Sequence, residues 1–225
     1  MGLRSHALVV LIAVMSFAPA TAATLSITGG TSAALPDNYD PAPELDRASV
    51  QALTGSNQIT VFESAVNGGA IGGGVAADDL VSMRFTFLGK EAAATNYLYV
   101  TDRDDTQKSL DNLGAKGSFV EAVSKTGYLG FSFETIHNRR VGSGHIANGG
   151  LSSAQSMKLA FSDIFNDGKS VLIFLGDGRG DSDFDDMVLR LDVEHIPHAP
   201  LPAAGILMVA GIGALAAMRR LRRKS

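Results

Sequence analysis

Apolar and polar residues alternate along several short stretches of the chain. The clearest is residues 80–88, where Val81, Met83, Phe85 and Phe87 share one side and polar residues occupy the other. A period of two is typical of a half-buried β-strand. Similar runs lie at 24–28, 58–63, 96–101, 128–134 and 157–161, separated by turns rich in Gly, Asn and Asp. This spacing predicts repeated short strands.

Two further apolar runs flank an acidic, glycine-rich loop. Residues 170–175 are almost continuously apolar, which indicates a deeply buried strand. Residues 187–194 alternate, so we expect one set to face the core (Met187, Leu189, Leu191 and Val193) and the other to face water (Val188, Arg190, Asp192 and Glu194). Glycines at 176, 178 and 180 suit a tight connection between them. The pattern predicts a strand–loop–strand hairpin.

The whole of 24–194 is predicted to be all-β. We expect a single antiparallel β-sandwich, jelly-roll-like, because short strands recur with turn residues between them. Only 107–123 offers a helical alternative, and Gly114 and Gly117 weaken it. After the first strand, prolines at 36, 41 and 43 mark irregular structure up to about residue 47.

The loop between the last two strands is the candidate metal site. Five of the ten residues from 177 to 186 are aspartates, opposed by Arg179 alone: Asp177, Asp181, Asp183, Asp185 and Asp186. Carboxylates this close repel one another, and calcium accepts six to eight oxygen ligands in a flexible shell. The spacing begins like an EF-hand loop but lacks the glycine at position six and the flanking helices. Two interpretations remain open: an irregular calcium loop, or aspartates that hydrogen-bond their own backbone as turn formers.

Both ends of the chain carry apolar segments that differ from the middle. Residues 1–23 have the basic, apolar and small-residue regions of a secretory signal peptide. A linker, 195–200, leads to 201–218, eighteen residues without a charge that are expected to form a transmembrane helix. The tail 219–225 follows with a basic cluster (Arg219, Arg220, Arg222, Arg223 and Lys224). The positive-inside rule then predicts that the basic end stays in the cytoplasm and that the domain lies on the other side of the membrane.

Composition narrows the classes of partner and chemistry. The chain has no cysteine, so disulfides and thiolate metal sites are absent. Outside the two terminal segments the chain has 13 Lys and Arg, whereas all 23 Asp and Glu lie there. A body that acidic excludes nucleic acid as a partner, since nucleic-acid binding needs a basic face.

Three segments resemble exported bacterial proteins of the PEP-CTERM type. The first is Gly176-Asp-Gly-Arg-Gly-Asp-Ser-Asp-Phe-Asp-Asp-Met-Val-Leu-Arg190, and the second is Phe85-Thr-Phe-Leu-Gly-Lys-Glu-Ala92. The third, Ala199-Pro-Leu-Pro-Ala203 before the apolar helix, is similar to the VPLPA variant of the sorting signal, with Ala199 in place of Val. The resemblance implies a sorting motif at Pro200, Leu201, Pro202 and Ala203. It further implies an inner-membrane anchor with the domain on the periplasmic side. An exosortase-type sorting enzyme is then the expected partner, with delivery to the cell surface or the exopolysaccharide matrix.

Together these features predict a non-enzymatic exported protein of the cell surface or extracellular matrix, with calcium at the acidic loop as an addition. No complete catalytic pattern occurs in the sequence. Two alternatives stay open. One is a calcium-dependent carbohydrate-binding module with a groove near the loop, lined by residues such as Tyr97, Tyr99 or Tyr128. The other is an exopolysaccharide hydrolase, which needs two carboxylates at glycosidase separation in a cleft.

Overall fold

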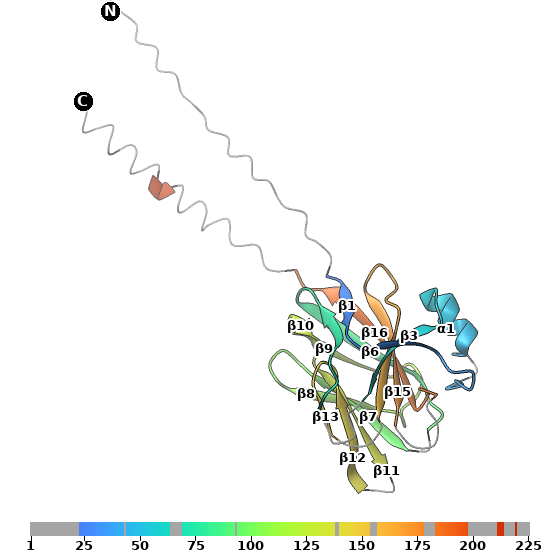
Figure 1. The fold of residues 1–225 in the computed structure, drawn as a ribbon. Coiled ribbons are helices and arrows are strands. Elements are labelled where there is room, and N and C mark those ends of the chain that lie inside the picture. Colours follow the sequence, from blue (N-terminus) through green and yellow to red (C-terminus); the bar gives the residue numbers. More distant parts are fainter. Residues whose placement is uncertain are drawn as a thin grey trace, which may run out of the picture.

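The structure, a computed structural model, describes residues 23–42, 44–63, 69–92, 94–137, 140–153, 157–177, 183–197, 211–213 and 219. Within these residues the fold is mostly β, built from antiparallel strands in three sheets (Figure 1). The predicted predominance of antiparallel β-strands is therefore confirmed. The described residues also contain a helix (Arg47–Thr54), which was not predicted.

The sheets combine strands from distant parts of the chain. The seven-stranded sheet has the order β2 (Thr31–Ala34), β3 (Gln58–Glu63), β14 (Lys158–Ser162), β15 (Ser170–Gly176), β16 (Met187–His195), β6 (Val81–Gly89) and β9 (Phe119–Val123). The six-stranded sheet has the order β4 (Gly69–Ala70), β13 (Leu151–Ser153), β12 (Arg140–Ala147), β11 (Phe131–His137), β7 (Thr95–Thr101) and β8 (Gln107–Asp111). The small sheet is β1 (Leu25–Thr28), β5 (Gly74–Ala77) and β10 (Gly127–Tyr128).

The main hydrophobic core lies between the two larger sheets. Its members come from both, and aromatic rings meet across the gap: the centroids of Phe85 and Phe131 lie 5.2 Å apart and those of Phe131 and Phe161 6.4 Å apart, all edge to face. Such pairs add about 0.5–1.5 kcal/mol each beyond the area they bury. The alternating pattern of β6 and β16 predicts that Phe85 and Leu191 face the core, and both side chains are fully buried.

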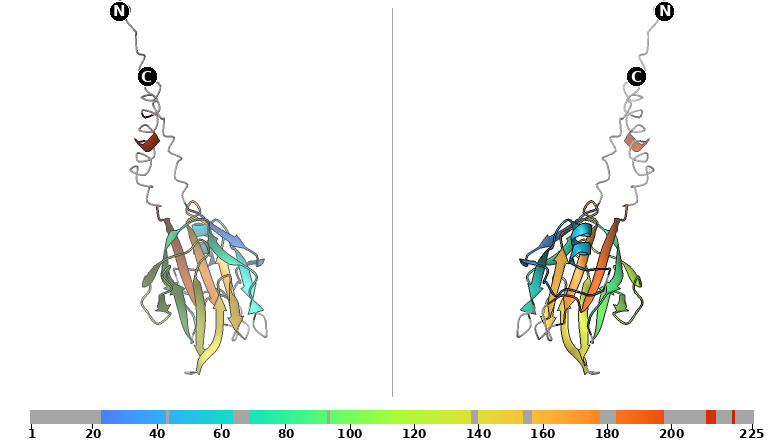
Figure 2. Two further views of the ribbon diagram at one scale, coloured as in Figure 1. Left: turned by 90° about the vertical axis from the view of Figure 1, so that its left-hand side faces the viewer. Right: turned by 90° about the vertical axis from the view of Figure 1, so that its right-hand side faces the viewer.

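A second cluster covers the other face of the seven-stranded sheet. Residues 35–42, residues 44–46 and helix α1 (Arg47–Thr54) lie over β15 and β16, as Figure 2 shows for the helix. Tyr39 packs edge to face on Phe174, with ring centroids 5.7 Å apart. The prediction that Val188 faces water is wrong, because this cover buries it completely. The proline-rich stretch, expected to be merely irregular, thus gives the sheet two buried faces.

The helical alternative for 107–123 is also wrong. This segment forms β8, a turn and β9. Asp111 ends β8 by accepting hydrogen bonds from the main-chain N–H groups of Leu113 and Gly114 at 3.0 and 3.1 Å, and Gly117 has φ +84°. A side-chain turn at Asp111 and a glycine in the left-handed region break a helix here.

The predicted signal peptide (1–23) and the sorting motif (200–203) lie outside the described residues, apart from Ala23. Of the predicted 201–218 helix, residues 211–213 are described, and they are helical and exposed. In the described part of the chain, no helix has both the length and the apolar character that a membrane crossing requires.

Candidate metal site

The loop from β15 to β16 approaches the proline-containing segment that covers the sheet. Asp177 and residues 183–186 are described; Asp181 lies outside the described residues. Asp177, Asp183 and Asp185 are buried, with exposed fractions of 7%, 3% and 2%. Carboxylates this deeply buried need partners, since an isolated charge is costly to remove from water.

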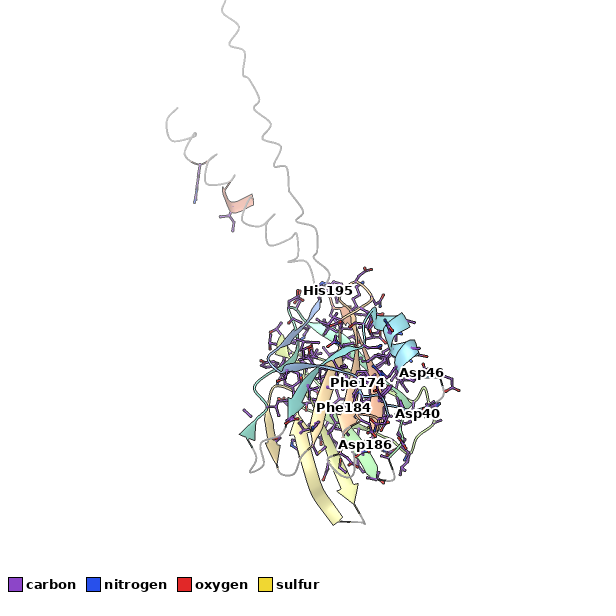
Figure 3. All side chains as sticks on the ribbon, turned by 45° about the vertical axis from the view of Figure 1, so that its right-hand side comes forward. Asp40, Asp46, Phe174, Phe184, Asp186 and His195 are labelled. Carbon is purple, nitrogen blue, oxygen red and sulfur yellow. The ribbon has the colours of Figure 1, made fainter. Side chains whose placement is uncertain are left out.

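Phe184 anchors the end of the loop. Its side chain is buried in the second core cluster, near Phe174 (Figure 3), while its backbone has φ +65°. A bulky residue at positive φ is strained by about 1–3 kcal/mol, so the surrounding packing must hold it there. Because the Phe184 ring is held in the second core cluster, it fixes the positions of Asp183 and Asp185, its neighbours on either side.

Asp183 and Asp185 meet a third carboxylate, that of Glu91, which follows β6. One carboxylate oxygen from each of the three lies within 4.8 Å of the other two. Glu91 is exposed, whereas the two aspartates are buried. The main-chain N–H of Glu91 donates to the carbonyl oxygen of Asp185 at 2.8 Å, which fixes this strand end to the loop.

The cover segment supplies hydrogen bonds to the two buried aspartates. The Asn38 amide donates to Asp183 Oδ2 at 3.0 Å, and the main-chain N–H of Asp40 donates to Asp185 Oδ2 at 2.9 Å. Among the ion pairs formed by described residues, none includes Asp183, Asp185 or Glu91. The hydrogen-bond donors around the cluster, the Asn38 amide and the Asp40 main-chain N–H, are therefore neutral and do not balance carboxylate charge.

The electrostatics of Asp185 follow from this arrangement. Burial raises the pKa of Asp185 to about 8. The N–H of Asp40 opposes the rise, while the adjacent Asp183 and Glu91 carboxylates add to it. Without a cation, the folded protein thus favours the protonated, neutral form of this side chain at neutral pH.

Tyr39 adds a buried polar group beside the cluster. Its side chain is 3% exposed, and its hydroxyl has no hydrogen-bond partner among the described residues. Burial raises the pKa of Tyr39, and the negative charge of Asp185 is the next cause. A buried hydroxyl without a partner costs about 1–3 kcal/mol. A hydrated cation held by the carboxylates would offer this hydroxyl a hydrogen-bond partner.

The remaining predicted ligands have other roles. Asp186 Oδ2 accepts from the main-chain N–H of Asp177 at 2.6 Å, which closes the base of the loop. The carbonyl oxygen of Asp186 accepts from the amides of Asn96 and Asn112 at 3.2 and 3.3 Å, linking the loop to the six-stranded sheet. Neither aspartate belongs to the carboxylate cluster. For Asp186, whose carboxylate binds the main chain of its own loop, the turn-former interpretation describes the observed contact.

Of the five predicted ligands, the structure thus gathers Asp183 and Asp185 and adds Glu91. Glu91 is distant in sequence and follows a strand whose alternation gives no sign of it. Three carboxylates supply three to six oxygens, and the exposed side leaves room for water to complete a calcium shell of six to eight. A further group of acidic residues, in the turn at 102–105, is not part of this cluster. Its carboxylates have lysine partners, since Asp102 pairs with Lys108 and Asp105 with Lys125, each at 2.7 Å.

A groove near the loop differs from the one expected for a carbohydrate-binding module. It has a volume of about 690 Å³ and is lined by β2 and β3 residues, Phe184 and the Lys158–Glu63 ion pair (3.0 Å). Tyr97, Tyr99 and Tyr128 are not part of its lining. This groove therefore does not match the tyrosine-lined groove that the carbohydrate-binding alternative predicts.

Comparison with protein-family models, curated proteins and solved structures gives no match to this chain.

Proposed function

We propose that this chain is a non-enzymatic exported protein whose single, jelly-roll-like β-sandwich domain is held together at one edge by a bound calcium ion. The observation that carries the proposal is the cluster of Glu91, Asp183 and Asp185. These residues join the end of β6 to the β15–β16 loop, and Asn38 and Asp40 bind the same loop from the cover segment. An ion here stabilises three segments that are far apart in sequence.

Charge balance favours a cation over a purely structural turn. Two carboxylates at about 4 Å repel by roughly 1 kcal/mol in water and more where burial lowers the effective dielectric. A turn built only for hydrogen bonding gains nothing from a third carboxylate brought in from another strand. A divalent ion converts this repulsion into attraction and prefers hard oxygen ligands of this kind.

The location follows from the terminal segments. A signal peptide (1–23) directs export, and the helix 201–218 with the basic tail 219–225 holds the chain in the inner membrane. The motif Pro200–Ala203 is then the recognition site of an exosortase-type enzyme, which releases the domain to the cell surface or the exopolysaccharide matrix. A stable, acidic, disulfide-free domain suits display there, and the ion contributes the rigidity that disulfides give other exported proteins.

Thermal unfolding of residues 23–197, which contain both hydrophobic clusters, tests the ion. We expect a higher melting temperature in calcium than in EDTA, since a ligand at a hundred times its Kd adds about 2.7 kcal/mol. Asp183→Asn should remove the calcium-dependent shift, whereas Asp163→Asn, an exposed aspartate elsewhere, should retain it. An unchanged melting temperature of the wild-type protein at millimolar calcium would falsify the metal site.

A further inference from the structure

The outer face of the six-stranded sheet carries two rows of side chains that the proposed calcium site does not use. Residues paired across antiparallel strands share a face. One row is Ser109, Tyr99, Ser132 and Ala147; the next is Asp111, Tyr97, Glu134 and His145. The intervening residues, such as Leu98 and Phe133, are buried in the main core. Both rows therefore point away from the core.

Tyr97 and Tyr99 form the centre of this face. They stand two residues apart on β7, their ring centroids lie 6.1 Å apart, and their planes differ by 16°. Both rings are half-buried by their neighbours, which restricts their motion. Burial and a hydrogen bond to the Glu134 carboxylate raise the pKa of Tyr99. Two stacked, restrained tyrosine rings provide aromatic contact area on this face at low entropic cost.

The formal charges in the two rows are negative. Asp111 and Glu134 flank Tyr97 on the neighbouring strands, and neither row contains Lys or Arg among its described members. Asp111 uses Oδ1 in its turn, which leaves Oδ2 for a ligand. Lys108, the nearest lysine on β8, is turned away from the face and binds Asp102 Oδ2 at 2.7 Å and the Glu121 carbonyl at 2.8 Å.

We propose that this face binds a polysaccharide of amino sugars that carry free ammonium groups. The C–H bonds on one face of a pyranose ring are slightly positive and rest against the negative face of an aromatic ring. Ammonium groups are attracted both to tyrosine rings and to the carboxylates of Glu134 and Asp111. Charge complementarity selects this occupant, because acidic glycans are repelled by the two carboxylates and by the acidic body as a whole.

The full chain in detergent micelles, titrated with the glucosamine hexamer at pH 6, tests the proposal. The protein has four tyrosines and no tryptophan, so its intrinsic fluorescence reports directly on tyrosine environments. We expect a saturable fluorescence change with the glucosamine hexamer and binding at least about ten-fold weaker with the N-acetylglucosamine hexamer, which keeps the backbone and lacks the charge.

Variants distinguish binding at this face from general electrostatic attraction of the ligand to an acidic protein. Tyr97→Ala combined with Tyr99→Ala, and separately Glu134→Gln, should weaken binding about ten-fold as measured by calorimetry. Tyr128→Ala, on the small sheet, and Glu194→Gln, on β16, make matched changes elsewhere and should leave the affinity within about two-fold. Calcium and EDTA should give equal affinities, so failure here and failure of the calcium site are distinguishable.

Three outcomes would overturn the proposal. One is the absence of any tyrosine signal with the glucosamine hexamer. Another is equal binding of the N-acetylated hexamer. The third is equal loss of binding in the Glu134→Gln and Glu194→Gln proteins, which would show that only overall charge matters. Glu134→Gln is nearly isosteric and Glu134 is only half-buried, so this variant keeps the test valid even where the tyrosine variants unfold.

Discussion

Asp185→Asn should make the calcium-free protein more stable at alkaline pH while abolishing its response to calcium. Asparagine has the shape of aspartate, and its Oδ1 can still accept the hydrogen bond that the N–H of Asp40 gives Asp185 at 2.9 Å. What the substitution removes is the charge that the fold disfavours. The burial of Asp185 and the nearby carboxylates of Asp183 and Glu91 are the causes.

The sign and size follow from the pKa. The pKa of Asp185 is raised from 3.8 to about 8 in the folded protein. Between these values the folded state keeps a proton that the unfolded state has lost, so stability falls as pH rises from about 4 to about 8. A group fully sealed from water would lose roughly 5–6 kcal/mol over that range. Because Glu91 is exposed and admits water to the cluster, we expect about 2 kcal/mol.

The assay is thermal unfolding of both proteins in EDTA at pH 5 and pH 8.5. The difference between the two isolates Asp185, because other titrating groups are common to both. At pH 8.5 the variant should melt about 4–8 °C above the wild type, and at pH 5 the gap should be small. In millimolar calcium the wild type should recover the difference and the variant should not change. A variant less stable than the wild type in EDTA at pH 8.5 would refute the reasoning, since it would mean that the charge is already compensated.

Three further predictions concern other parts of the molecule. Phe184→Ala should destabilise the protein by about 3–5 kcal/mol in chemical denaturation. It should also weaken calcium binding, because it removes the buried ring that positions Asp183 and Asp185. Intact calcium affinity would show that the ring has no positioning role. Asn148→Ala should cost about 2–4 kcal/mol, since this buried side chain makes three hydrogen bonds of 2.7–2.9 Å to the main chain of neighbouring strands; the exposed Asn166 should tolerate alanine with a smaller loss. Leu201→Ala with Pro202→Ala should keep the full chain in the inner membrane on cell fractionation, and normal release would contradict the sorting role of the motif.

The strands were predictable because their signal is local. On β6 and β16, side chains that alternate in polarity also alternate in burial, and the buried set lies in the main core. The hairpin of β15 and β16 follows from two apolar runs separated by a glycine-rich loop. Each of these inferences needs only the identity of residues a few positions apart and the two-residue period of a strand.

Two predictions were wrong, the solvent-facing position of Val188 and the helical alternative for residues 107–123. Val188 faces away from the main core, as its position in the alternation requires, but residues 35–42, residues 44–46 and α1 cover that side. No period within 187–194 reveals such a cover. The turn at 111–117 depends on hydrogen bonds that the Asp111 carboxylate accepts from main-chain N–H groups and on one glycine in the left-handed region. The pattern of apolar and polar residues shows neither feature.

The candidate site divides in the same way. The sequence alone determined that the β15–β16 loop is acidic, because five aspartates are adjacent in the chain. Only the tertiary structure decided which of them converge: Phe184 inserts into the second core cluster and holds its two neighbours inward, whereas Asp177 and Asp186 close the loop. It also brought in Glu91, more than ninety positions away from its partners. The physical reason is that strand pairing and burial depend on local patterns, whereas a cluster of like charges exists only where packing forces separate segments together.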